Sequence, residues 1–251
     1  QSYVNLYQAT GSDQYLIKAR EQAQWLWDNF FNAPKKWVQR SNHQTNMAFL
    51  EDQALMIDAF IDLYQVDMNE KWLVKARNLT VNTLKNFNPI DGLYPYCTED
   101  SDLFLEAIPT LDTNLPSGNA LMARNLMRLG EFYFIEHGEW FDLGIDLLHT
   151  QKNEIQNQPT YKGEWIKASL LQKNPPYEIA IVGDDFRNIQ KAFYRKGFHP
   201  DWVMMGGTGE GEIPLLKNKA VKGQTVIYVC IDKVCKLPTR AFDQAFEMAT
   251  D

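Results

Sequence analysis

Along most of the chain, hydrophobic residues recur every three or four positions, the period of amphipathic helices. A first helix is predicted after the start signal Gly11-Ser12-Asp13, and a second, apolar on most sides, over residues 50–64. A third is predicted from about residue 70 to residue 87, where Asn88-Pro89 ends it. Three later helices are predicted from the spacing of these apolar residues: Met122, Leu126, Leu129 and Tyr133; Phe141, Ile145 and Leu148; Tyr161, Trp165 and Ala168.

The links between these helices alternate in length. Residues 33–46 and 89–115 form long aromatic and polar links, whereas residues 65–69 and 135–138 are short. Short links make antiparallel helical hairpins and long links lead to the next pair, which is the rhythm of an α/α toroid. The predicted fold class is mainly α, with toroid hairpins over residues 1–174.

The pattern changes after Pro175-Pro176. Residues 178–182 indicate a buried strand, Gly183-Asp184-Asp185 can cap the helix that follows, and residues 202–205 indicate a parallel strand of a βαβ unit. A hairpin is expected next, over residues 225–230 and 235–238, and then a closing helix over residues 241–249. The second predicted domain is therefore a small C-terminal α/β module over residues 175–251.

Composition narrows the classes of partner. With 25 Lys and Arg against 32 Asp and Glu, the net charge is −7, and no basic stripe offsets it. Such a field repels phosphate backbones, so nucleic-acid binding is not expected. No apolar run approaches the ~20 residues of a membrane span, so no membrane partner is expected and a cytoplasmic location is favoured.

The cysteine count is odd, with 3 in the chain, which argues against a framework of several disulfides. Cys230 and Cys235 can face each other across the predicted hairpin. They are expected either as two reduced thiols or as an isolated disulfide, and Cys97 as a lone thiol.

Several stretches, in order along the chain, resemble one family of proteins. They are FLEDQA at 49–54, DGLY at 91–94, LPSGNA at 115–120, IAIVGD at 179–184 and the segment around Cys230 and Cys235. The family comprises the spermatogenesis-associated thioredoxin-domain proteins and their bacterial relatives. Its members have an N-terminal thioredoxin-like domain and then a six-hairpin, glycosidase-like toroid, similar to that of N-acylglucosamine 2-epimerases. The resemblance implies that this chain is the C-terminal part of such a protein, with a partial toroid and an upstream thioredoxin-like domain as its partner.

Carboxylates at the expected mouth of the toroid are the first candidate site residues. Glu51 and Asp52 lie early in a predicted inner helix, and the N-termini of inner helices converge at one mouth. Either residue is therefore a candidate catalytic acid or base. The structural alternative is that both complement the helix dipole. Adjacent helical residues point about 100° apart, so the two are not expected to act as a facing pair.

The long link after the third helix carries Tyr94, Tyr96 and Asp100. Rings that stack on a sugar, next to carboxylates that bind its hydroxyls, are typical of sugar sites. We therefore take Asp100 as a third catalytic candidate and the two tyrosines as substrate-binding candidates. The alternative is an ordinary hairpin, because Asp91-Gly92 is a type I′ turn signal with aromatic neighbours.

The segment that opens the fourth helix adds Ser117 and Asn119 as substrate-binding candidates. Ser117 is a plausible N-cap, and Asn119 is expected to face the mouth as an amide hydrogen-bonding group. Packing explains both residues as well as binding does. No metal and no cofactor is expected, because none of the 4 histidines has a second ligand at metal spacing. Among them, His43 in the long link is the one to follow.

Two functions remain open, and the sequence leaves undecided whether the protein is an enzyme. The first is a toroid that binds or processes a carbohydrate in its mouth. The second is a non-catalytic scaffold that docks a partner or serves the upstream thioredoxin-like domain. An enzyme needs at least two ionisable groups that converge on an aromatic-lined pocket. A scaffold needs only a filled or polar interior and an exposed apolar patch.

Overall fold

The structure, a computed structural model, describes residues 1–41, 47–98, 107–197, 199 and 202–250. By compactness the chain divides into a sheet unit of residues 1–21, 62–72 and 174–251, and a hairpin unit of residues 22–61 and 73–173. The division into domains at residue 174 stays a prediction.

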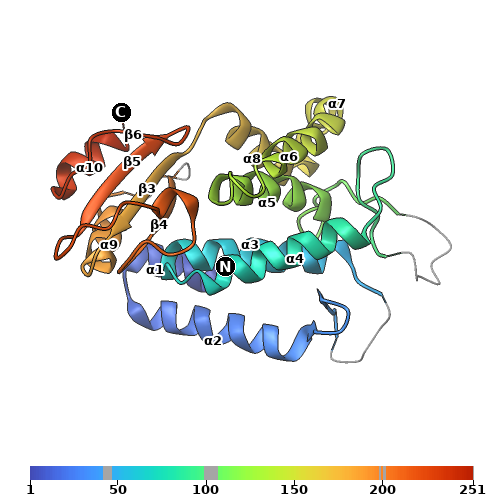
Figure 1. The fold of residues 1–251 in the computed structure, drawn as a ribbon. Coiled ribbons are helices and arrows are strands. Elements are labelled where there is room, and N and C mark those ends of the chain that lie inside the picture. Colours follow the sequence, from blue (N-terminus) through green and yellow to red (C-terminus); the bar gives the residue numbers. More distant parts are fainter. Residues whose placement is uncertain (42–46, 99–106, 198, 200–201, 251) are drawn as a thin grey trace. The chain divides into compact units, whose positions relative to one another are not determined.

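Helical hairpins build the hairpin unit (Figure 1). A short turn joins α3 (Leu50–Asp67) to α4 (Lys71–Asn86), and another joins α5 (Gly118–Phe132) to α6 (Glu139–Thr150). In the hairpin unit, α3 and α5 are buried on nearly every side, whereas α4 and α6 each have a buried and an exposed face. This is the expected alternation of inner and outer helices. The predicted fold class, mainly α with helical hairpins before a small α/β part, is confirmed.

Two glycines let α5 and α6 pack closely. A Cβ atom at Gly144 would lie 2.6 Å from the carbonyl oxygen of Ala123, and one at Gly130 would lie 2.8 Å from the backbone nitrogen of Phe141. Protein interiors are close-packed, so a larger residue at either position has to push the two helices apart.

Most predicted helix positions are confirmed. α2 (Asp13–Phe30) begins at the predicted start signal, whereas α8 (Gly163–Lys173) begins later than expected because Tyr161 belongs to a preceding 3-10 helix (Pro159–Tyr161). Among the elements that were not predicted are α7 (Lys152–Asn157) and a hairpin of β1 (Phe31–Asn32) with β2 (Trp37–Val38). α7 buries no residue and the two strands are very short, so neither leaves a periodic apolar pattern.

The sheet unit is built on a four-stranded sheet in the order β4-β3-β5-β6. β3 (Tyr177–Val182) pairs in parallel with β4 (Trp202–Gly207) and antiparallel with β5 (Val226–Ile231), which forms a hairpin with β6 (Val234–Cys235). α9 (Phe186–Lys196) connects β3 to β4, which confirms the βαβ unit. α10 (Phe242–Met248) is the predicted closing helix, and α1 (Ser2–Thr10) packs on α9.

Two local predictions in the sheet unit are resolved by the structure. Asp185 stands at the N-cap of α9, but its side chain makes no capping bond and instead accepts a hydrogen bond from Asn188 Nδ2 at 2.5 Å. The predicted segment therefore supplies the N-cap residue of α9, but not a side-chain capping bond. Cys230 and Cys235 are paired across the β5–β6 hairpin and form a disulfide, while Cys97 is a free thiol.

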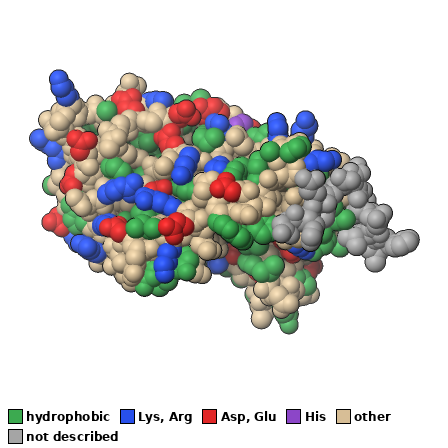
Figure 2. Space-filling model, turned by 90° about the horizontal axis from the view of Figure 1, so that it is seen from below, with side chains coloured by type: hydrophobic (Ala, Val, Ile, Leu, Met, Phe, Trp, Pro, Cys, Tyr) green, Lys and Arg blue, Asp and Glu red, His purple; other side chains and the backbone are tan. Residues whose placement is uncertain are grey.

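Charged side chains of both signs are interspersed on the face of the molecule shown in Figure 2. Large hydrophobic side chains are also exposed, among them Ile17 and Trp25 of α2, at 50% and 53%. Within the described ranges, no helix combines the length and the apolar character that crossing a bilayer requires.

Candidate functional site

The acidic first turn of α3 lies beside the loop that carries the predicted tyrosines. A β-bridge pairs Phe49 with Cys97, and the amide of Leu50 donates to the carbonyl oxygen of Tyr96 at 2.9 Å. These main-chain contacts join two segments that are far apart in the sequence. They bring one of the predicted tyrosines next to both predicted carboxylates.

Arg40 connects these residues into one group, which we call the Arg40 cluster: Arg40, Glu51, Asp52 and Tyr96. Its Nε lies 3.1 Å from Asp52 Oδ2, and its Nη2 lies 3.4 Å from Glu51 Oε2. Its Nη1 donates to the Tyr96 hydroxyl at 2.6 Å. The guanidinium carbon also lies 4.1 Å from the centroid of the Phe49 ring. The two adjacent carboxylates, which point in different directions from α3, therefore share one cation.

Arg40 is the most accessible member of the three charged side chains. Its side chain is 41% exposed, against 18% for Glu51 and 20% for Asp52. Burial by itself lowers the pKa of Arg40, but hydrogen bonds to Asp52 and Tyr96 outweigh that effect and raise the pKa above its ordinary value. A molecule that arrives from solvent thus meets a fixed cation before it meets either carboxylate.

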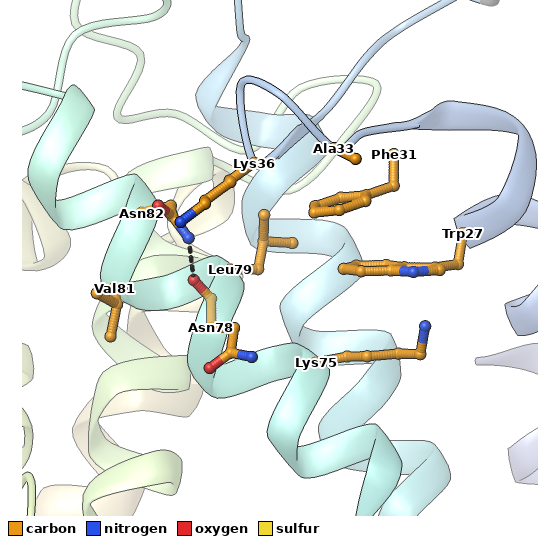
Figure 3. Close-up of a pocket in the computed structure, with 9 residues that line it drawn as sticks. All are labelled: Trp27, Phe31, Ala33, Lys36, Lys75, Asn78, Leu79, Val81 and Asn82. Carbon is orange, nitrogen blue, oxygen red and sulfur yellow. Dashed lines mark hydrogen bonds between the residues drawn. The ribbon is translucent and has the colours of Figure 1, made fainter.

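The hairpin unit also contains a pocket of about 520 Å³, which is lined by residues of the end of α2, the β1–β2 turn and α4 (Figure 3). None of the predicted site residues that the structure describes lines it, and neither does any described Asp or Glu. The pocket and the predicted carboxylates are therefore separate features.

Asn119 and Tyr94 attach the Asp91-Gly92 hairpin to α5. Asn119 Oδ1 accepts from the Tyr94 amide at 2.8 Å, and Asn119 Nδ2 donates to the Tyr94 carbonyl oxygen at 2.8 Å. Asn119 is fully buried and burial raises the pKa of Tyr94 to about 12. The expectation that Asn119 faces the mouth is corrected, because its amide binds buried main chain that would otherwise lack partners. A substrate-binding role for either residue stays a prediction.

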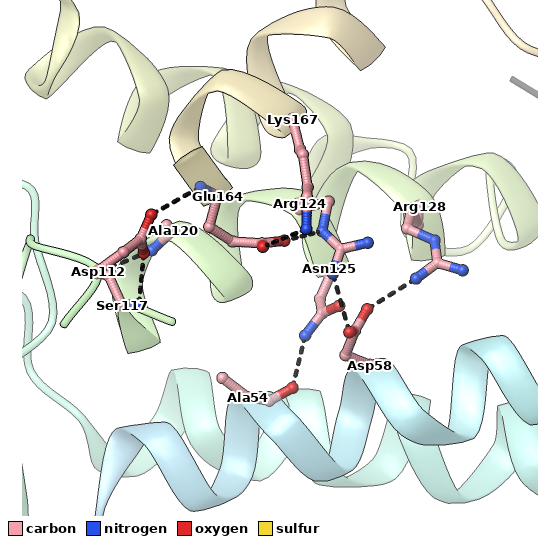
Figure 4. Close-up of polar contacts among 10 residues, drawn as sticks. All are labelled: Ala54, Asp58, Asp112, Ser117, Ala120, Arg124, Asn125, Arg128, Glu164 and Lys167. Atoms are coloured by element: carbon pink, nitrogen blue, oxygen red, sulfur yellow. Dashed lines mark hydrogen bonds and ion pairs between the residues drawn. The ribbon is translucent and has the colours of Figure 1, made fainter. Parts of the chain in front are cut away.

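Ser117 is the N-cap of α5, as predicted. Its Oγ accepts from the Ala120 amide at 3.4 Å, which satisfies one of the free amides of the first turn. Asp112, which the sequence analysis did not single out, accepts from the Ser117 amide at 2.8 Å and from the Glu164 amide at 2.7 Å (Figure 4). One carboxylate thus binds the N-termini of both α5 and α8. Whether Ser117 also contacts a substrate stays a prediction.

A second charged group lies between α3, α5 and α8 (Figure 4), and we call it the Arg124 network: Asp58, Arg124, Arg128, Glu164 and Lys167. The two oxygens of Asp58 lie 2.8 Å from Arg124 Nη2 and 2.7 Å from Arg128 Nη1. Arg124 Nε lies 2.6 Å from Glu164 Oε1, and Lys167 Nζ lies 3.0 Å from Glu164 Oε2. The side chains of Asp58 and Glu164 are only 1% and 5% exposed.

The Arg124 network neutralises charge inside the hairpin unit. A buried carboxylate without a partner costs several kcal/mol, and here both buried carboxylates have cationic partners. The sequence analysis missed these residues. The available signal was a charged residue, Asp58, within an apolar stripe, and two arginines one turn apart on an otherwise apolar helix.

Two residues that the sequence analysis followed, Asp100 and His43, lie outside the described residues. Within the described part of the chain, no group of three or more His, Cys, Asp and Glu side chains is placed to hold a metal ion.

The chain is similar to a small set of longer proteins. It is 27% identical over 221 residues to human spermatogenesis-associated protein 20, and the alignment covers 83% of this chain and 28% of the human protein. The mouse protein of the same name is 25% identical over an alignment that covers 92% of this chain and 32% of its own length. Over most of its length this chain is similar in sequence to a part of spermatogenesis-associated protein 20. No family model matches it.

The family resemblance predicted from the sequence is thereby confirmed. An uncharacterized protein of Caenorhabditis elegans is also similar to this chain, at 21% identity over an alignment that covers 98% of this chain and 36% of that protein. The chain spans less than half of the length of each of these relatives.

One solved structure has a partly similar backbone, the cellobiose 2-epimerase of Bacillus thermoamylovorans. It is 14% identical, covers 60% of this chain and 38% of its own, and has a TM-score of 0.47. A likeness at this level says nothing about activity.

Proposed function

We propose that this chain is a non-catalytic helical scaffold and not a carbohydrate-processing enzyme. The observation that supports the proposal is the pairing of the candidate acids with one arginine. Glu51 and Asp52 lie 3.4 Å and 3.1 Å from Arg40, so each of the two candidate acids has this arginine as a partner. Glycoside chemistry needs two carboxylates that face each other across roughly 5–10 Å of open space, and these two share a cation instead.

The inside of the hairpin unit also suits a scaffold. Asp58 and Glu164 are bound by arginines of α5, and Asn125 Nδ2 donates to the carbonyl oxygen of Ala54 at 2.8 Å. These contacts tie α3, α5 and α8 to one another through polar groups that have partners. Buried polar contacts of this kind hold helices in one arrangement, which is what a docking platform requires.

The partner that we propose is the thioredoxin-like domain that the family resemblance implies. In this view the helical hairpins position that domain, or its substrates, and the chemistry belongs to the partner. The proposal concerns the described residues, which correspond to a part of the longer relatives.

Two measurements test the scaffold. Cellobiose, mannose and N-acetylglucosamine are incubated with the purified chain and followed by proton NMR, and we expect no new sugar signals. A thioredoxin-like domain of the same family, supplied as a separate polypeptide, is then titrated into the chain by calorimetry, and we expect saturable binding. Turnover of a sugar that Glu51→Gln abolishes, or no binding of the domain, would overturn the proposal.

A second candidate function is carbohydrate binding without turnover at the Arg40 cluster. The observation that favours it is the 41% exposure of Arg40, beside the rings of Phe49 and Tyr96. Guanidinium and carboxylate groups bind sugar hydroxyls, and rings pack on sugar faces. A panel of neutral sugars is tested by thermal shift on the parent chain, on Arg40→Gln and on Arg77→Gln. Arg77 serves as a control because it lies on the outer helix α4. Stabilisation that Arg40→Gln abolishes and Arg77→Gln keeps supports sugar binding, and equal shifts in all three proteins exclude this site.

A further inference from the structure

The pocket beside α4 has a rigid aromatic wall (Figure 3). The rings of Trp27 and Phe31 are stacked, with centroids 3.8 Å apart and planes 13° from parallel. The Lys75 ammonium lies 3.9 Å from the centroid of the Trp27 ring, on the side opposite Phe31. Because both faces of Trp27 are covered, the indole is fixed in place. The apolar surface that a ligand can reach is completed by Phe31, Leu79 and Val81.

The polar lining of the pocket is cationic. It contains Lys36, Lys75 and the amides of Asn78 and Asn82, and the described lining has no Asp or Glu. In a chain with a net charge of −7, a pocket lining that contains Lys36 and has no described Asp or Glu is a local exception. Among the described residues, the Lys36 ammonium has no ion-pair partner, and Figure 3 shows it extending toward Asn82.

The backbone at Lys36 supports a role for this side chain. Its φ angle is 60°, in the left-handed region that favours glycine, and its amide closes the turn by donating to the carbonyl oxygen of Asn32 at 2.6 Å. A lysine at a position where glycine fits better is explained if its side chain has a function. The function that we assign to it is to place its ammonium at the pocket.

From these observations we infer that the pocket binds a small organic anion whose body is an aromatic ring or a branched hydrocarbon. The carboxylate, or an equivalent anionic group, binds to Lys36, and the body packs on Phe31 and Leu79. The volume of about 520 Å³ lies within the range of small-molecule sites, about 300–1,000 Å³. The inference is independent of the scaffold proposal, because none of the residues of the Arg40 cluster lines this pocket.

The test uses three probes that separate the two features of the ligand. Phenylacetate carries the ring and the carboxylate, benzyl alcohol carries the ring alone, and acetate carries the carboxylate alone. Each is titrated into the chain by calorimetry, with saturation-transfer NMR for weak binding. We expect phenylacetate to bind at least about tenfold more tightly than either of the others, because a charge-assisted hydrogen bond and apolar burial each supply at least that factor.

The variants locate the binding. Lys36→Gly removes the ammonium while it relaxes the backbone, so the melting temperature is expected to stay level or rise while phenylacetate affinity falls about tenfold. Lys35→Ala removes the neighbouring lysine, which does not line the pocket, and is expected to leave affinity within about twofold. The inference is overturned if phenylacetate does not bind, if it binds no better than acetate or benzyl alcohol, or if Lys36→Gly keeps the parent affinity.

Discussion

Replacing Arg124 by methionine tests how the inner helices are held together. Arg124 is the only residue of its network that contacts both buried carboxylates among the described residues, with Asp58 at 2.8 Å and Glu164 at 2.6 Å. Methionine keeps most of the side-chain volume and removes the charge. The variant therefore leaves two carboxylates that are 1% and 5% exposed with one cationic partner fewer.

The expected cost follows from the partners that remain. Removing one member of a buried ion pair costs about 3–5 kcal/mol. Asp58 keeps Arg128 at 2.7 Å, whereas Glu164 keeps only Lys167, whose side chain is 65% exposed. We therefore expect the lower end of the range, about 3 kcal/mol. At this chain length that corresponds to a drop in melting temperature of about 6–12 °C.

The assay is urea unfolding followed by circular dichroism at 222 nm, with a thermal melt as a second measurement. Because the chain has two compact units, the transition is first tested for two-state behaviour with a second probe, tryptophan fluorescence. Lys167→Met is the matched control: it removes an exposed cation from the same network and is expected to cost about 0–1 kcal/mol.

The double variant Arg124→Met with Glu164→Gln sharpens the result. Each single change leaves a buried group without its partner, so the double variant is expected to cost clearly less than the sum of the two singles. If Arg124→Met destabilises the chain no more than Lys167→Met does, the network is not the buried charge group described above and the reasoning is refuted.

Three further predictions concern single features. Burial raises the pKa of Tyr94 to about 12, whereas an unfolded tyrosine ionises near 10. This residue therefore contributes stability that is present below pH 10 and is lost as pH rises from 10 to 12, about 2.7 kcal/mol in all. In urea titrations from pH 9 to 11.5, Tyr94→Phe should lack that loss, and stability curves of parent and variant that run parallel would contradict the assignment. Gly144→Ala places a Cβ atom 2.6 Å from the backbone of α5 and should lower the free energy of unfolding in urea by about 1–3 kcal/mol. Gly209→Ala is the control, because a Cβ atom there has nothing within 4 Å and should change that free energy little. Equal effects of the two changes would contradict a close contact between α5 and α6. Reduction of the Cys230–Cys235 disulfide opens a short loop and should lower the free energy of unfolding by about 2 kcal/mol. A phosphine reductant should therefore lower the melting temperature of the parent chain, and it should leave that of the Cys230→Ala/Cys235→Ala variant unchanged.

The helices and strands could be predicted because each depends on residues that are near one another in the sequence. Burying one face of a helix requires apolar residues every three or four positions, and that spacing is present in α2 to α6. The Asp91-Gly92 turn followed from two residues whose φ angles are 50° and 80° in the structure. Where such a pattern is missing, as in α7, the element was missed as well.

The candidate site could be predicted only in part. The sequence pointed to Glu51, Asp52 and Tyr96, and the structure brings all three together. It did not point to Arg40, whose contacts with them join residues that are distant in the sequence.

The sequence by itself determined the helical hairpins, the βαβ unit and the N-cap of α5, because local hydrogen bonding and apolar spacing encode them. It also determined the relation to the longer proteins, because several of its segments match theirs in order. Only the tertiary structure decided that two carboxylates share Arg40, that Asn119 binds the main chain of Tyr94, and that Lys36 and Lys75 line one pocket. Each of these pairings joins residues from different elements. Their approach depends on how neighbouring helices are packed and in which register, which no local pattern along the chain specifies.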